Sequence, residues 1–93
     1  IAESVFGDIK LFPNPTKGDF VIDFYKSYNE LEILIYDING RIVDKSKLEN
    51  KSRINLNPNI SEGLYFIKVE YNQEIKTEKI MLVKYILRDY NIF

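Results

Sequence analysis

The sequence predicts an all-β domain, a small antiparallel β-sandwich of about seven strands in the immunoglobulin-like style. Composition is the first reason, because Ile, Val, Phe and Tyr account for 32 of the 93 residues whereas alanine occurs once. β-Branched and aromatic side chains suit strands, and alanine is the best helix former. Spacing is the second reason, since strand-like segments recur roughly every ten residues and end in turn residues. The connections are too short for crossover helices, so neighbouring strands should pair antiparallel.

Seven segments of the chain have the character of strands. In chain order they are residues 9–12, 19–25, 31–36, 41–45, 53–56, 64–71 and 76–83. Most of them alternate apolar and polar side chains, so each has one face to bury, as two packed sheets require. The side chains that we expect to dominate the core are Phe20, Ile22, Ile33, Ile35, Tyr65, Ile67 and Val69.

Turn residues separate these segments. Pro13, Asn14 and Pro15 predict a stiff corner after the first strand, because proline fixes its own φ and favours an extended conformation in the residue before it. Asn39 and Gly40 predict the tip of a tight hairpin, since both residue types tolerate positive φ. Two further glycines mark sharp turns elsewhere, Gly18 and Gly63.

Composition also limits the chemistry. The chain has 13 basic and 14 acidic residues and contains neither histidine nor cysteine. Ser-His-Asp and Cys-His catalysis, Cys/His zinc sites and thiol redox chemistry are therefore excluded. The basic residues are dispersed without interleaved aromatics, which argues against a nucleic-acid partner. We expect a protein that is not an enzyme and needs no cofactor.

The residue types suggest two possible binding sites, one for calcium and one for a sugar. Asp37, Asn39 and Gly40 resemble the start of a calcium loop, but the later acidic ligand is missing and a hairpin turn explains the same residues, so we expect no metal there. Tyrosines near strand ends could form a sugar-stacking platform, which makes a carbohydrate-binding module an alternative. The candidates for it are Tyr25, Tyr36 and Tyr71.

The two ends of the chain differ from its centre. We interpret residues 1–8 as a linker remnant and residues 85–93 as an apolar C-terminal extension. Six of those last nine residues are apolar or aromatic, unlike a disordered polar tail. The extension could cover the sandwich as an extra strand or short helix, or it could join a second chain through a sticky edge. The second possibility would make the chain a structural or oligomerising module.

Four sequence blocks occur in a characteristic order between residues 9 and 84. The first is LFPNPTKGDF at residues 11–20, and the second is IYDINGRIV at residues 35–43. The third is SEGLYFIKV at residues 61–69, and the fourth is KIMLVK at residues 79–84. Together they resemble the C-terminal sorting domains of proteins exported by the type IX secretion system of Gram-negative bacteria. The motif residues at the turns of these blocks are Gly18, Asp37, Gly40, Gly63 and Tyr65.

The resemblance implies an export signal at the C-terminus of a larger cargo protein. Such cargo crosses the periplasm, and its sorting domain, here residues 9–84, docks to the outer-membrane translocon and a shuttle protein. The cargo is then secreted or held at the cell surface. In many members a surface sortase cuts upstream of the domain, which would place the cut in or before residues 1–8.

Recognition by the translocon should involve exposed residues of the first and last blocks. Our candidates are Pro13, Asn14 and Pro15 at the corner, with Lys79 and Lys84 around the final strand. Lysines can pair with an acidic partner surface. A simpler explanation for both is that they keep an edge strand soluble.

Overall fold

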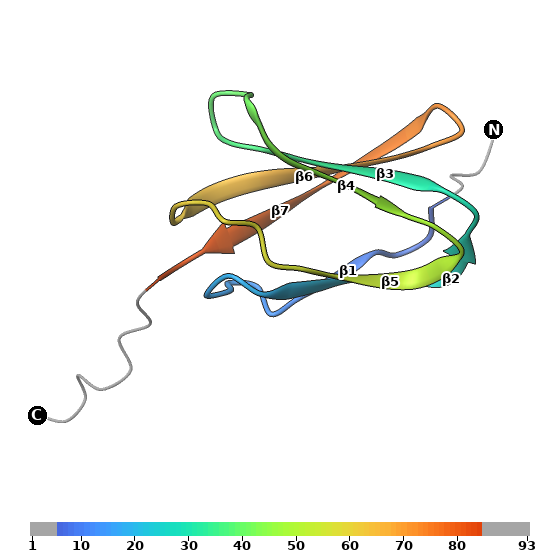
Figure 1. Ribbon diagram of the computed structural model, residues 1–93, viewed down its shortest axis with the longest axis horizontal. Helices are drawn as coiled ribbons and strands as arrows, with labels where there is room; N and C mark the ends of the chain where they lie inside the picture. The colour runs from blue at the N-terminus through green and yellow to red at the C-terminus, as the bar shows by residue number, and fades with distance from the viewer. Residues whose placement is uncertain (1–5, 85–93) are drawn as a thin grey trace, which may run out of the picture.

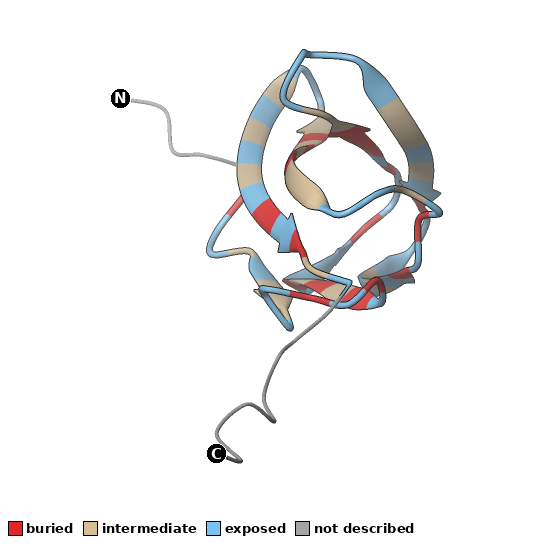
Figure 2. Ribbon diagram, turned by 90° about the vertical axis from the view of Figure 1, so that its left-hand side faces the viewer, coloured by how far each residue is buried: buried red, intermediate tan, exposed pale blue. Residues whose placement is uncertain are grey.

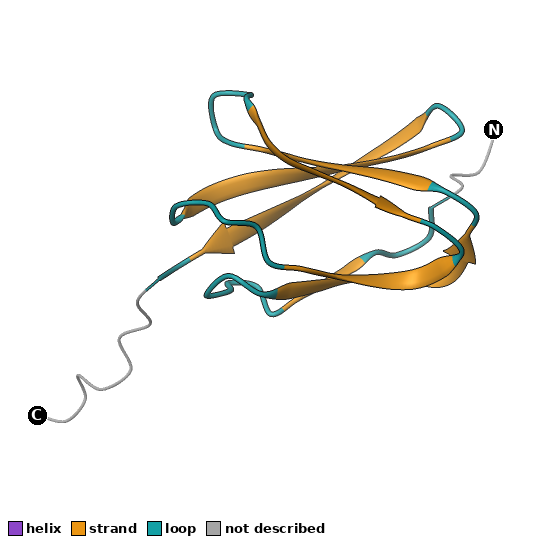
Figure 3. Cartoon of the chain, in the orientation of Figure 1, coloured by secondary structure: helices purple, strands orange, loops and turns teal. Residues whose placement is uncertain are grey.

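The computed structural model describes residues 6–84, which form a sandwich of two β-sheets (Figure 1). In chain order its strands are β1 (Lys10–Phe12), β2 (Phe20–Tyr28), β3 (Leu31–Tyr36), β4 (Ile42–Leu48), β5 (Lys51–Leu56), β6 (Gly63–Tyr71) and β7 (Glu74–Leu82). Loops make up the rest of the described chain, with no helix among residues 6–84 (Figure 3). None of the described residues belongs to a helix able to cross a membrane.

The two sheets have different sizes. The smaller has the order β1-β2-β5 and the larger the order β4-β3-β6-β7, and every strand pair within them is antiparallel. The prediction of a seven-stranded antiparallel sandwich is therefore confirmed. Its likeness to immunoglobulin domains stays a prediction.

The core lies between the sheets, where Figure 2 shows the buried segments. All seven side chains that the sequence predicted for the core are buried. The alternation explains this result, because residues paired across neighbouring strands face the same side of a sheet: Ile33 pairs with Val69, and Ile35 pairs with Ile67.

Several strands are longer than predicted, because their ends continue to pair although polar residues there interrupt the alternating pattern. β4 continues to Leu48 and β5 begins at Lys51, so a short turn at Asn50 (φ 55°) joins them. β2 continues to Tyr28 beyond an irregularity in its pairing with β5, at which Tyr25 has a φ of 66°. Beyond this bulge Tyr28 is buried like Phe24, whereas Lys26 is exposed although alternation would place it on the same face.

The core also reaches into the segment interpreted as a linker. The Phe6 side chain is 4% exposed, and its ring lies 5.7 Å from that of Tyr28. Lys76 Nζ donates a hydrogen bond to the carbonyl of Gly7 at 3.0 Å, which fastens the same segment to β7. Residues 6 and 7 thus take part in the packing of the domain.

Candidate functional site

The corner (residues 13–18) leaves the smaller sheet after β1 and crosses to the larger one. Both peptide bonds that precede Pro13 and Pro15 are cis, which the sequence did not indicate. The prolines and Asn14 are exposed, whereas Thr16 is 1% exposed. The corner is therefore an exposed ridge with a buried base.

Asn14 joins this ridge to the outer edge of β7. Its side-chain nitrogen donates to the carbonyl of Lys79 at 3.0 Å, and its side-chain oxygen accepts the N–H of Met81 at 3.0 Å. The amide thereby bonds to β7 as the peptide group of a neighbouring strand would. An asparagine side chain suits this role, since it carries one carbonyl and one NH₂ group in a single plane.

Thr16 continues the same pairing through its backbone. Its N–H donates to the carbonyl of Met81 at 2.9 Å, and its carbonyl accepts the N–H of Val83 at 2.8 Å. Thr16 and Leu82 form a parallel bridge, whereas all pairs between the named strands are antiparallel. The corner therefore closes one side of the sandwich by covering part of an edge strand.

The Thr16 side chain holds the inside of the corner. Its hydroxyl donates to the carbonyl of Asp19 and accepts the N–H of Gly18 at 3.0 Å. Gly18 has a φ of 155°, within the range that side chains rarely adopt. The Thr-Lys-Gly step of the first block is thus a small buried hydrogen-bond system.

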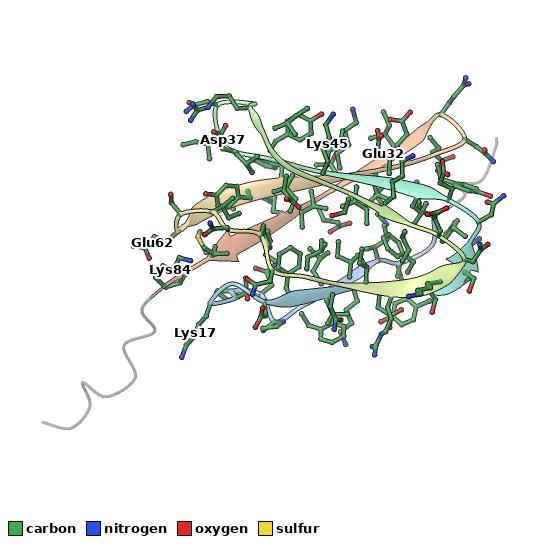
Figure 4. All side chains as sticks on the ribbon, viewed as in Figure 1. Lys17, Glu32, Asp37, Lys45, Glu62 and Lys84 are labelled. Carbon is green, nitrogen blue, oxygen red and sulfur yellow. The ribbon has the colours of Figure 1, made fainter. Side chains whose placement is uncertain are left out.

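The two predicted lysines lie close to this corner in the fold. Lys79 supplies the carbonyl that Asn14 binds, and its side chain is exposed. The backbone N–H of Lys84 donates to the Glu62 carboxylate at 3.1 Å. Figure 4 shows Lys17, Glu62 and Lys84 at the same end of the sandwich. Five residues selected from opposite ends of the sequence thus gather at one end of the molecule.

Two shallow hollows flank the corner. One, of about 460 Å³, lies against the smaller sheet and is lined mainly by apolar side chains that include Phe12, Pro13 and Phe20. The other, of about 530 Å³, includes Pro13, Pro15 and Lys17 in its lining. The prolines consequently line hollows into which a partner's side chains could fit.

The second block forms the β3–β4 hairpin that the sequence predicted. The N–H of Gly40 donates to the carbonyl of Asp37 at 3.0 Å, and Gly40 has a φ of 83°. Asn39 does not share this conformation, because it is not among the residues with positive φ. The hairpin prediction is therefore confirmed, while the expected positive φ at Asn39 is wrong.

Asp37 organises this turn through its carboxylate. Oδ1 accepts the backbone N–H groups of Asn39 at 2.8 Å and Arg41 at 3.0 Å, and Oδ2 accepts Arg41 Nε at 2.9 Å. The backbone N–H of Arg41 is the main cause that lowers the pKa of the Asp37 carboxyl below its ordinary value. The N–H of Asn39 and the Arg41 guanidinium lower it further, and desolvation opposes them. These contacts explain why the block has Asp before the turn and a basic residue after the glycine.

The third block carries a similar internal bond. The Tyr65 hydroxyl donates to the carbonyl of Ser61 at 2.7 Å, which holds the loop before β6. A tyrosine near the start of a strand that bonds back to the chain upstream is common in immunoglobulin-like sandwiches. Gly63 begins β6 with a φ of 151°.

The structure does not assemble the other sites that the sequence suggested. Tyr36 lies on the outer face of the larger sheet, beside Lys68, whereas the Tyr71 ring packs edge-on against Tyr28 at 4.9 Å. Tyr25 lies in the smaller sheet, so the three tyrosines share no platform. Within residues 6–84, no three metal-ligating side chains are grouped to hold an ion.

Sequence reasoning missed the role of Thr16 and the bonds by which Asn14 joins the corner to β7. Thr16 had no signal beyond its place in a motif, and the bonding partner of Asn14 lies 65 residues along the chain. A pairing of that length cannot be inferred from local turn chemistry.

Comparison with known proteins agrees with this arrangement. The model of the family described as secretion system C-terminal sorting domain matches residues 10–84, which include all seven strands. No curated protein matches the chain. The family match covers most of the chain, and the four blocks coincide with turns and strands of the sandwich. The chain therefore belongs to the type IX secretion system C-terminal sorting domains, which are non-catalytic secretion signals of cargo proteins.

Proposed function

We propose that the sorting machinery reads this domain as a folded surface made of Pro13, Asn14 and Pro15 together with Lys79 and Lys84. The observation that supports it most is the double hydrogen bond from the Asn14 side chain to Lys79 and Met81. It makes one surface out of two blocks that are far apart in the sequence. A surface already ordered before binding loses less conformational entropy when a partner docks.

The partners in this proposal are the outer-membrane translocon and its shuttle protein. A cargo domain on the N-terminal side is carried through the periplasm and then released or held at the cell surface. A surface sortase cuts in or before residues 1–8. The domain is a substrate of that enzyme and brings no catalytic group of its own.

The lysines contribute mainly to the encounter with the machinery. Both side chains are exposed, and charges of this kind steer association more than they strengthen the bound state. The corner and its two hollows then supply the shape that a partner recognises.

The experiment is export of a periplasmic reporter fused to the full chain in a type IX-competent cell. Deleting residues 76–93 should leave the reporter in the periplasm, because it removes most of β7 and the edge to which the corner bonds. Since this deletion also disrupts the fold, Lys79→Glu combined with Lys84→Glu provides the finer test. It should reduce export while leaving the melting temperature nearly unchanged.

A matched control is Lys47→Glu combined with Lys51→Glu, which makes the same charge change on exposed side chains of β4 and β5. This control should be exported like the unaltered chain. Equal export of both double variants would show that Lys79 and Lys84 only keep an edge soluble. Surface display of the deleted fusion would show that the signal lies outside residues 76–93.

A further inference from the structure

The outer face of the larger sheet is apolar at the end near the β3–β4 turn. Strand register places the side chains there in rows, because residues directly opposite one another share a face. One row contains Ile42, Tyr36, Phe66 and Lys79, and the row beyond it contains Leu64 and Met81. Ile42 is 47% exposed and Met81 38% exposed, so apolar groups of this face are in contact with solvent.

Charges on this face are sorted along the strands. The next row contains Lys45, Leu34, Lys68 and Thr77, so these three rows have lysines and no carboxylate. The fourth row, farther from the turn, contains Glu32 and Glu70 between Lys47 and Ile75. Figure 4 shows Lys45 and Glu32 projecting from this outer side of the sheet.

We propose that these three rows, the basic-apolar face, dock on a protein surface whose apolar centre is bordered by Asp and Glu side chains. The inference rests on the proposed function, because it assigns the face to the same sorting machinery, and it adds the chemistry of the partner. Lys79 connects the two surfaces, since its carbonyl bonds to Asn14 and its side chain lies on the basic-apolar face.

Charge complementarity selects this partner over a second copy of the chain. In a two-fold dimer whose axis runs along the strands, the row with Lys45 and Lys68 would face the same row of the second copy, which has no carboxylate. Like charges in such positions oppose association. An acidic border on the partner would instead pair with Lys45, Lys68 and Lys79.

The low exposure of several apolar side chains argues against a lipid surface as the partner of this face. Tyr36, Phe66 and Leu64 are half-buried, and Leu34 is only 7% exposed although it lies on the outer face. Long lysine side chains can cover apolar neighbours and reach farther than they do. The apolar side chains therefore lie lower than the lysine side chains around them. This arrangement fits a complementary protein surface better than insertion among acyl chains.

The chain offers a matched pair of substitutions for the test. Ile42 and Ile75 lie on the same face of the same sheet, in its two edge strands, with exposed fractions of 47% and 51%. Ile42→Glu should lower export of the fused reporter about tenfold relative to Ile75→Glu, as expected when a charge enters the apolar centre of an interface. Both variants should keep a cooperative melting transition.

A second pair keeps the proposal falsifiable if Ile42→Glu fails to fold. Lys45 and Lys47 are both exposed residues of β4, but only Lys45 belongs to the basic-apolar face. Lys45→Glu should reduce export, whereas Lys47→Glu should not. If the unaltered fusion is exported and both members of each pair are exported equally, the inference is wrong while the proposed function stands. Failure of the unaltered fusion to leave the periplasm would instead refute the proposed function.

Three direct measurements exclude the other occupants. Sedimentation should show a monomer, and vesicles containing lipid A should not bind the chain. Dimerisation, or vesicle binding that Ile42→Glu abolishes, would overturn the proposal.

A cysteine in place of Ile42 would be the only thiol in the chain. It should react with a maleimide equally fast with and without residues 85–93, and faster reaction after truncation would show that those residues cover the face.

Discussion

The corner and the β3–β4 turn are both signature motifs, but they are held in opposite ways. The turn is held by hydrogen bonds within its own five residues, because the Asp37 carboxylate accepts the N–H groups of Asn39 and Arg41. The corner depends on β7, to which Asn14 and Thr16 bond. A motif can therefore be a local fold or one half of a long-range contact, and only the second kind brings distant blocks into one surface.

The largest effect is expected from Thr16→Val, which removes the hydroxyl that holds the buried base of the corner from within and leaves the backbone bonds to β7 in place. It leaves the N–H of Gly18 and the carbonyl of Asp19 without that partner. We expect unfolding free energy to fall by about 2–3 kcal/mol, the cost of unsatisfied buried groups. Urea denaturation measures it, with exposed Lys17→Ala as the control. A loss as small as that of the control would mean that the hydroxyl is dispensable.

Gly40→Val tests the self-contained turn. No atom lies within 4 Å of a Cβ added at Gly40, so the penalty comes from the φ of 83° alone. We expect a loss of roughly 1–2 kcal/mol for a β-branched side chain in that conformation. Gly7→Val is the matched control, because Gly7 also has open space but no positive φ. Equal melting temperatures for the two variants would contradict the argument.

Asn14→Ala tests the exposed bond between the corner and β7. Water can replace part of what the amide provides, so we expect only about 1 kcal/mol of destabilisation. Hydrogen exchange should reveal the change more clearly, with faster exchange at the N–H of Met81. The β3–β4 turn should exchange as before. Acceleration spread evenly over both regions would mean that they are not independent.

The smallest effect is the pH dependence of the turn. Because the pKa of Asp37 is lowered in the folded state, its ionised form stabilises the fold. That contribution is complete above the pKa of the unfolded chain, about 4, and is lost as pH falls through the lower folded value. The stability difference between the unaltered chain and Asp37→Asn should therefore shrink in acid. A stability difference that stays constant down to pH 2 would show that the Asp37 side chain stabilises the turn through its shape and not through its charge.

The sequence predicted most of what alternation and local turn chemistry determine. Phe20 and Ile22 identify the buried face of β2 by parity, and Gly40 identifies a hairpin by its conformational freedom. The bulge at Tyr25 and the burial of Phe6 were not predictable in this way, because each depends on how distant strands pack. The candidate recognition residues were selected from their motifs, whereas the bonds of Asn14 that bring them together could not be inferred from the sequence.

The parallel bridge between Thr16 and Leu82 has a mechanical consequence. Cargo is joined on the N-terminal side of the corner, and β7 lies near the other end of the chain. A pull between these ends draws the paired segments along each other, so the bonds of Thr16 with Met81 and Val83 are loaded in shear and share the force. Forced unfolding is governed by the rate at which such a barrier is crossed. We therefore expect the corner to resist a pull between the two ends more strongly than any one of its hydrogen bonds would alone.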